Sequence, residues 1–239
     1  MQDFIHYLLS GSIYIFSIEF LAALAGIYYL KNTKATKWDY YFVVYLWITI
    51  IVEITGLYST IGYYSDYKYF SFVEYTGFRA NFWLFNIYAI FAFSFLSLYY
   101  RSLLSSKTSQ KILKFLTGLY IVVSLLMLFS SDVFFNGFSK FSFFSGVLIL
   151  LLSVFMYYYE LLLTDKILNL KYNLSFYFSV GLIIFYVCLT PLTFLSDYLA
   201  SENGLFLKLF ENFKLYGNLF LYSTFILAFL ICSKKNKSS

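Results

Sequence analysis

The chain alternates between long apolar runs and short polar connections. A membrane-spanning helix needs about 20 predominantly apolar residues, and seven runs meet or approach that length. They cover residues 4–30, 40–64, 82–100, 115–130, 141–163, 174–195 and 215–232. The pattern predicts an all-α membrane protein in which residues 1–239 form a single domain, a bundle of seven transmembrane helices.

The basic residues are distributed unevenly over the connections between these runs. The connections after odd-numbered spans and the C-terminal tail hold 12 of the 17: Lys31, Lys34, Lys37, Arg101, Lys107, Lys111, Lys114, Lys166, Lys171, Lys234, Lys235 and Lys237. Cytoplasmic connections carry an excess of Lys and Arg. We therefore expect the N-terminus outside, the C-terminus in the cytoplasm, and a multi-pass protein of the bacterial inner membrane.

Composition agrees with this assignment. Hydrophobic residues make up 61% of the chain and charged residues 12%, whereas a soluble domain carries about 25% charged residues. The net charge of +5 is spread over several short connections and forms no basic patch, so a nucleic-acid partner is not expected. Cys188 and Cys232 fall at different predicted depths, and we expect two small core residues without a disulfide.

Four polar residues lie where a lipid-facing helix should have none. Glu19 and Glu53 lie inside the first and second spans, and Asn86 and Asn218 in the outer thirds of the third and seventh. A carboxylate within the membrane costs about 2.5 kcal/mol or more, so each should face the bundle interior or a watery cavity. From the helical rise, Glu53 is expected at mid-membrane, with Glu19 about one turn nearer the cytoplasm.

These residues predict a polar cavity that opens outward. Asn86 and Asn218 share a similar predicted depth, and Glu53, Glu19 and the hydroxyl of Tyr88 belong to the same candidate set. The alternative is structural: the same groups hydrogen-bond hydroxyls across helices. Both interpretations remain open from the sequence.

Other positions predict packing or interfacial roles. Glu160 beside Tyr159 is expected as a polar cluster at the cytoplasmic end of the fifth span, with the carboxylate reaching the interface. Pro191 should kink the sixth span. Ala22 and Gly26 form a small-xxx-small pair for close helix contact. Residues 205–214 show helical spacing and are expected as an interfacial helix before the seventh span.

Catalytic and cofactor signatures are absent from the sequence. The single histidine, His6, makes a histidine-based metal site a poor expectation. No P-loop, nucleophile elbow or dinucleotide fingerprint occurs. We expect no cofactor, no metal and no enzymatic activity, and a lipid-modifying enzyme is kept only as a minor alternative.

Four local motifs resemble a bacteroidete-type family of uncharacterised seven-helix membrane proteins. They are Glu53-Ile54-Thr55-Gly56, Trp83-Leu84-Phe85-Asn86-Ile87-Tyr88, Tyr158-Tyr159-Glu160-Leu161-Leu162, and residues 179–186, which include Gly181. Similar regions form the membrane input part of some sensor histidine kinases. The resemblance implies detection of a ligand or membrane state, with a role for Glu53, Asn86, Tyr159, Glu160 and Gly181.

The leading hypothesis is a receptor, sensor or scaffold. It would bind a small molecule or membrane lipid in the outward-facing cavity and engage a cytoplasmic or membrane protein partner. The alternative is a proton-coupled transporter or ion pathway with Glu19 and Glu53 as relay carboxylates, although no inverted repeat is evident.

Overall fold

The chain is helical throughout the part that the structure describes. The computed structural model describes residues 11–164, 170–200 and 204–234. Within these ranges seven helices are long and apolar enough to span a membrane, and none of these residues forms a strand. The prediction of an all-α protein with seven helices long and apolar enough to span a membrane is confirmed for the described residues.

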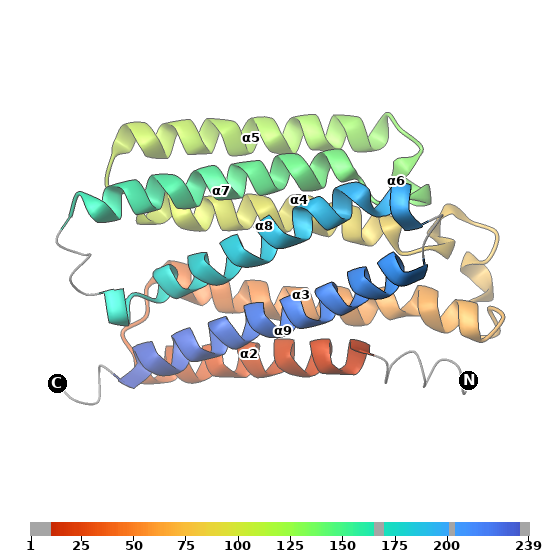
Figure 1. The fold of residues 1–239 in the computed structure, drawn as a ribbon, viewed down its shortest axis with the longest axis horizontal. Coiled ribbons are helices and arrows are strands. Elements are labelled where there is room, and N and C mark those ends of the chain that lie inside the picture. The colour runs from red at the N-terminus through yellow and green to blue at the C-terminus, as the bar shows by residue number, and fades with distance from the viewer. Residues whose placement is uncertain (1–10, 165–169, 201–203, 235–239) are drawn as a thin grey trace. The chain divides into compact units, whose positions relative to one another are not determined.

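The bounds of the seven long helices differ from the predicted spans mainly at their ends. They are α2 (Ile13–Asn32), α3 (Lys37–Tyr64), α4 (Phe82–Leu103), α5 (Lys107–Phe129), α7 (Lys140–Leu162), α8 (Leu174–Ala200) and α9 (Gly204–Lys234) (Figure 1). The short turns are η2 (Ser71–Val73), η3 (Gly77–Arg79) and α6 (Val133–Asn136). Residues 4–10 of the predicted first span, with His6, lie outside the described residues. The segment 205–214 is not a separate helix but the beginning of α9.

Side-chain caps fix several helix starts. At α3, Thr36 and Asp39 form a reciprocal box: the Thr36 hydroxyl accepts from Asp39 N–H at 3.2 Å, and the Asp39 carboxylate accepts from Thr36 N–H at 2.8 Å. Ser106 accepts from Ser109 N–H at the start of α5. The Asn173 side-chain oxygen accepts from Phe176 N–H at the start of α8. Each cap satisfies a backbone donor that the helix leaves unpaired.

The chain divides into two compact units, which are described one at a time. Unit 1 contains the described residues between 48 and 157, and unit 2 contains residues 11–47 and the described residues from 158 onward. The helices α3 and α7 contribute to both units.

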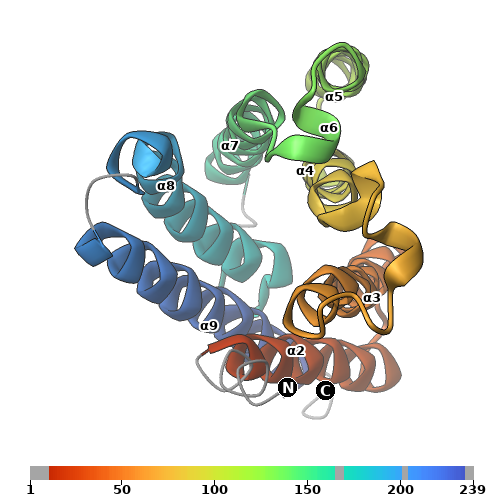
Figure 2. The same cartoon turned by 90° about the vertical axis from the view of Figure 1, so that its right-hand side faces the viewer.

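Hydroxyl groups join the helices of unit 1. The Ser97 hydroxyl on α4 hydrogen-bonds Thr117 on α5 at 2.9 Å and Ser153 on α7 at 2.8 Å. Gly146 of α7 lies directly against the Phe93 ring of α4. The short helix α6 contacts both α4 and α5 at one end of the unit (Figure 2). A polar centre therefore ties α4, α5 and α7 together.

Aromatic rings form the core of unit 2. Phe42 stacks on Phe178 with ring centroids 4.1 Å apart, and the edges of Phe225 and Phe229 meet this pair. All four side chains are fully buried. Gly26 brings α2 close to the α3 residue Val43 and to the Phe229 ring of the same core. Packing of rings and small residues thus joins α2, α3, α8 and α9.

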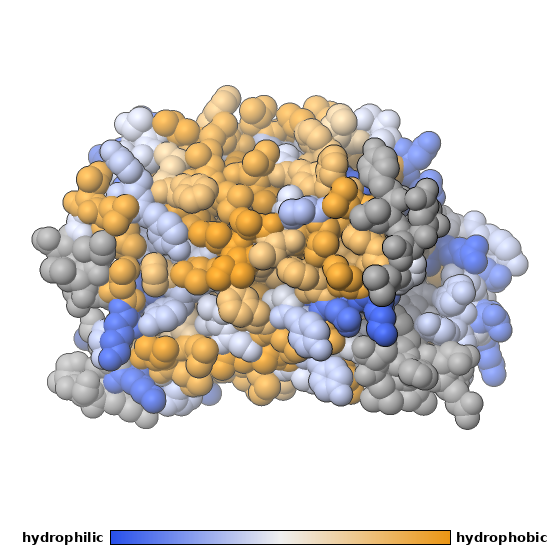
Figure 3. All heavy atoms as spheres, in the orientation of Figure 1, coloured by the Kyte–Doolittle hydropathy of each residue, from blue (hydrophilic) through white to orange (hydrophobic). Residues whose placement is uncertain are grey.

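The helices also expose large apolar side chains. Phe115, Phe129 and Leu148 are each at least 66% exposed, a pattern suited to lipid rather than water. In the face drawn in Figure 3, hydrophobic residues cover the middle of the helices and hydrophilic residues gather mainly toward their ends.

Candidate functional site

The helices α8 and α9 pack closely at one level of unit 2. A Cβ atom added to Gly181 on α8 would lie 3.3 Å from both Leu221 and Thr224 on α9. Since this is tighter than ordinary van der Waals contact, a side chain at this position would have to displace Leu221 or Thr224 by a few tenths of an ångström.

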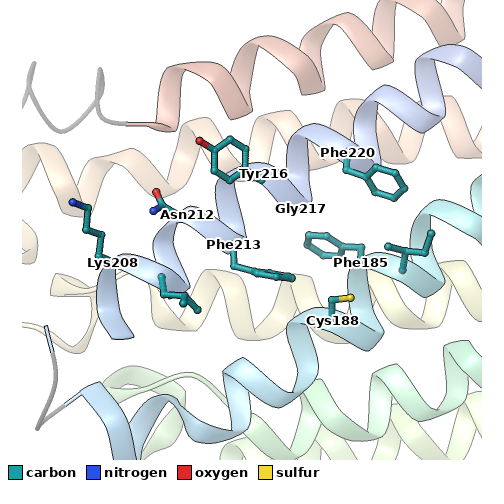
Figure 4. Close-up of a pocket in the computed structure, with 10 residues that line it drawn as sticks. Phe185, Cys188, Lys208, Asn212, Phe213, Tyr216, Gly217 and Phe220 are labelled. Carbon is teal, nitrogen blue, oxygen red and sulfur yellow. The ribbon is translucent and has the colours of Figure 1, made fainter. Parts of the chain in front are cut away.

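A groove opens between the same two helices on the N-terminal side of that contact along α9. Its volume is about 680 Å³, within the range of small-molecule sites, which is about 300 to 1,000 Å³. The lining residues are Ile184, Phe185 and Cys188 of α8 and Lys208, Leu209, Asn212, Phe213, Tyr216, Gly217 and Phe220 of α9 (Figure 4). The groove is therefore built almost wholly from side chains of two neighbouring helices.

Helical spacing divides the α9 wall into a polar and an apolar stripe. Lys208, Asn212 and Tyr216 recur every four residues and so share one side of the helix. Leu209 and Phe213 form the apolar stripe beside them. Figure 4 shows the Phe213 ring directed toward Phe185 and the Lys208 amine and the Asn212 amide near the N-terminal end of α9, pointing away from α8. The groove surface is therefore almost wholly apolar, and the two polar groups lie at its rim.

Gly217 sets the width of the groove where it narrows. A Cβ atom at this position would lie 3.2 Å from Cδ2 and Cε2 of the Phe185 ring. A larger side chain would push Phe185 or occupy the groove itself. A larger residue in place of Gly217 would therefore fill the groove.

Cys188 departs from the sequence-based expectation. It was expected to be a small core residue, but its side chain is exposed and lines the groove, whereas Cys232 is buried. Neither cysteine forms a disulfide. The prediction was wrong for Cys188 because the apolar composition around it does not distinguish a packed core from an open apolar groove.

The predicted cavity residues of unit 1 lie in a different setting. Asn86 is 1% exposed. Its amide nitrogen donates to the Gly137 carbonyl at 2.9 Å and the Val133 carbonyl at 3.4 Å, and its oxygen accepts from Ser139 N–H at 2.8 Å. These contacts fasten the connection around α6 to α4. This geometry agrees with the structural interpretation of Asn86, in which its amide hydrogen-bonds other parts of the protein.

Tyr88 and Glu53 also belong to unit 1. The hydroxyls of Tyr88 and Thr49 share a hydrogen bond of 2.6 Å between α4 and α3, and Glu53 is half-buried on α3. Neither residue lines the α8–α9 groove.

The remaining polar candidates belong to unit 2. Glu19 is 3% exposed on α2. Asn218 donates to the Lys214 carbonyl of its own helix at 2.8 Å and lies outside the groove lining, although it follows Gly217 directly. At the end of α7, Tyr159 is 67% exposed and Glu160 is half-buried. Glu19 belongs to unit 2 and Glu53 to unit 1. The predicted sharing of a proton between the two carboxyl groups therefore stays a prediction.

The predicted packing residues can be located within unit 2. Ala22 is fully buried, and a Cβ atom at Gly26 would lie 2.7 Å from Val43 Cγ2 and 3.3 Å from Phe229. Pro191 is exposed on α8, which continues to Ala200 as one helix. Neighbouring carbonyls of α8 accept hydrogen bonds from the Thr190 and Thr193 hydroxyls.

The groove lining carries few polar groups. It offers one amine, one amide, one phenol and one thiol on an apolar wall. No group of three or more His, Cys, Asp or Glu side chains able to hold a metal occurs in the described ranges.

No protein-family model, curated protein or solved structure matches the chain. A functional assignment therefore has to be argued from the geometry of the groove. Lys208, Asn212 and Phe213 are not among the residues that the sequence predicts for a site. Their four-residue and five-residue spacing along 205–214 predicts an interfacial helix and does not by itself indicate a groove.

Proposed function

We propose that this protein is a membrane receptor for an amphiphile with an anionic head group and one long apolar chain. The observation that carries the proposal is the α8–α9 groove, with its aromatic floor and the Lys208 and Asn212 side chains at one end. The chain of the amphiphile lies along Phe213 and Phe185, and the head group meets the amine and the amide.

The head group decides the selectivity of such a site. Lipid tails are as apolar as the groove, so transfer of a chain from the bilayer into the groove gains little hydrophobic free energy. Shape and the polar end therefore separate a bound ligand from ordinary surrounding lipid. An exposed charge pair contributes about 1 kcal/mol or less, which corresponds to a several-fold preference for an anionic head.

We further propose that the N-terminus faces outward and the C-terminus lies in the cytoplasm of a bacterial inner membrane. The uneven distribution of basic residues supports this orientation. It puts the connection between α8 and α9, next to Lys208, on the outer side. The resemblance to sensor input regions supports signalling through a cytoplasmic or membrane protein partner. A reporter fused after Ser239 is expected to be cytoplasmic, and a periplasmic reporter would reverse the orientation.

Equilibrium binding of lysophosphatidic acid to the purified protein tests the function. We expect saturable binding that exceeds binding of a monoacylglycerol with the same chain, because only the former carries a phosphate. Gly217→Leu fills the groove and is expected to weaken binding of both amphiphiles more than tenfold. Lys208→Gln is expected to remove the preference for the phosphate while leaving binding of the monoacylglycerol unchanged.

Lys214→Gln is the matched control, since Lys214 is on the same helix but lies over the Phe210 ring rather than in the groove lining. It should keep the preference for the phosphate. Equal loss in Lys208→Gln and Lys214→Gln, or unchanged binding in Gly217→Leu, would refute the proposed site.

A further inference from the structure

A second cavity lies at the end of unit 1 where α3 connects to α4. Its volume is about 550 Å³. It is lined by Ser59, Thr60, Tyr63, Tyr64, Tyr67, Thr76, Gly77, Arg79, Ala80, Phe82, Phe135 and Asn136. Residues from α3, the 65–81 connection, the start of α4, and α6 thus converge on one space, and this lining is far more polar than that of the α8–α9 groove.

Arg79 supplies the only charge in this lining. Its Nε donates to the Tyr67 hydroxyl at 3.0 Å, and its guanidinium lies 5.2 Å from the centre of the Tyr67 ring. The hydrogen bond to Tyr67 raises the pKa of Arg79 above its ordinary value, so the cation persists at every physiological pH. No described residue accepts a hydrogen bond from the two terminal nitrogens. They remain available to a ligand.

Other hydrogen-bonding groups border the same space. Thr60, Tyr63 and Asn136 line the cavity, and their side chains make no hydrogen bond to any residue that the structure describes. No lining residue is a carboxylate. One guanidinium with unsatisfied donors, together with hydroxyls and an amide, matches the needs of an oxyanion.

The walls of the cavity are fastened to α3. The Tyr58 hydroxyl donates to the Phe78 carbonyl at 2.6 Å, the Ser59 hydroxyl to the Arg79 carbonyl at 3.0 Å, and the Asn81 amide to the Gly56 carbonyl at 2.9 Å. The connection is therefore held in place along the segment that carries Arg79. A fixed wall lowers the entropic cost of binding.

The turn that presents Tyr67 is conformationally costly. Asp66 and Tyr67 have φ angles of 48° and 56°, a left-handed conformation that costs a residue with a side chain about 1 to 2 kcal/mol. The Tyr67 side chain is nevertheless buried, with 7% of its surface exposed. Its ring packs on Gly62, where an added Cβ atom would lie 3.0 Å from the ring. Local strain of this kind is concentrated at functional sites, and here it sets the position of the Arg79 partner.

We propose that this cavity binds a compact solute or head group through a carboxylate or phosphate held by Arg79. The terminal guanidinium nitrogens meet the oxyanion, and the tyrosine rings contact the rest of the ligand. The site is separate from the α8–α9 groove in residues and in the polarity of its lining, and it does not depend on the function proposed for that groove.

Binding to the full-length protein tests this site with three probes. Inorganic phosphate and benzoate are titrated in neutral detergent, and nanodiscs of phosphatidylcholine with or without phosphatidic acid test a lipid head group. We expect saturable binding of at least one oxyanion. Arg79 is exposed, and solvent screens an exposed charge pair, so Arg79→Gln should weaken binding several-fold. Arg79→Lys should lie between, because it keeps the charge but not the planar fork.

Lys68→Gln is the matched control, because it removes the same charge from the same connection at an exposed residue outside the lining. It should bind as the unchanged protein does. Binding of free phosphate or benzoate identifies a solute site, and binding only to phosphatidic acid identifies a head-group site. No binding of any probe, or equal weakening in Arg79→Gln and Lys68→Gln at unchanged melting temperature, overturns the proposal.

Discussion

The two units hold their helices together by different contacts. In unit 1 the Ser97, Thr117 and Ser153 hydroxyls meet at the centre of three helices, and Asn86 fastens the connection around α6. In unit 2 the corresponding place is filled by stacked and edge-on aromatic rings.

The difference reflects what is available for helix association in lipid. Burial of apolar side chains contributes little free energy to helix association in lipid, so the helices associate through close packing and interhelical hydrogen bonds. Unit 1 relies more on hydrogen bonds and unit 2 more on packing. The polar cavity belongs to unit 1 and the apolar α8–α9 groove to unit 2, although unit 1 also has a smaller apolar cavity of about 330 Å³ between α5 and α7.

The largest effect is expected where unit 1 also depends on close packing. Gly146→Val should destabilise the protein by about 3 kcal/mol, because a Cβ atom there overlaps the Phe93 ring and lies 2.8 Å from the Tyr120 hydroxyl. Gly118→Val on α5 has no atom within 4 Å of its Cβ position and should change stability by less than about 0.5 kcal/mol. Reversible unfolding in mixed micelles measures both.

Asn86→Leu should destabilise the protein by about 2 to 3 kcal/mol, because it leaves the half-buried Gly137 carbonyl and the buried Ser139 N–H without their partner. Asn218→Leu, whose amide bonds only its own helix, is the control, with an expected change below about 0.5 kcal/mol. Similar unfolding midpoints for the two variants would show that the hydrogen bonds of Asn86 do not stabilise the connection around α6.

Phe178→Leu tests the aromatic core of unit 2. It removes the stacking with Phe42, and an aromatic pair contributes about 0.5 to 1.5 kcal/mol beyond its area. We expect a loss of about 1.5 kcal/mol in the same unfolding measurement. A loss smaller than that of Ser97→Ala would contradict the assignment of packing to unit 2.

Ser97→Ala should have the smallest effect of the series. Interhelical hydrogen bonds in membranes contribute about 0.6 kcal/mol on average, and the Thr117 and Ser153 hydroxyls retain hydrogen bonds to the Leu113 and Ile149 carbonyls. A loss above about 2 kcal/mol would mean that the hydroxyl cluster acts as a single cooperative unit.

The long helices were predictable because spanning lipid constrains sequence so strongly. Every backbone group must be paired within the segment and nearly every side chain must be apolar, so residues 82–100 could be assigned without any knowledge of their neighbours. The start of α5 at Lys107 was harder, because Lys111 and Lys114 extend a helix beyond its apolar part.

The candidate sites were less predictable. Polarity marked Asn86 correctly as buried, but it did not reveal whether its partners were a ligand or the backbone around α6. The α8–α9 groove depends on where two helices separate beyond Gly181, which is a property of tertiary packing rather than of either helix alone. Cys188 and Phe213 consequently resembled ordinary apolar residues until the helices were paired.

The rate of Cys188 alkylation by a maleimide most directly tests occupancy of the α8–α9 groove. Cys188 lines the groove and is exposed, whereas Cys232 is buried, so a Cys188→Ala variant defines the background. Saturating lysophosphatidic acid should slow alkylation of Cys188 at least fivefold, and Gly217→Leu should abolish this protection. An alkylation rate that is unchanged by the amphiphile under conditions where it binds would contradict the central claim.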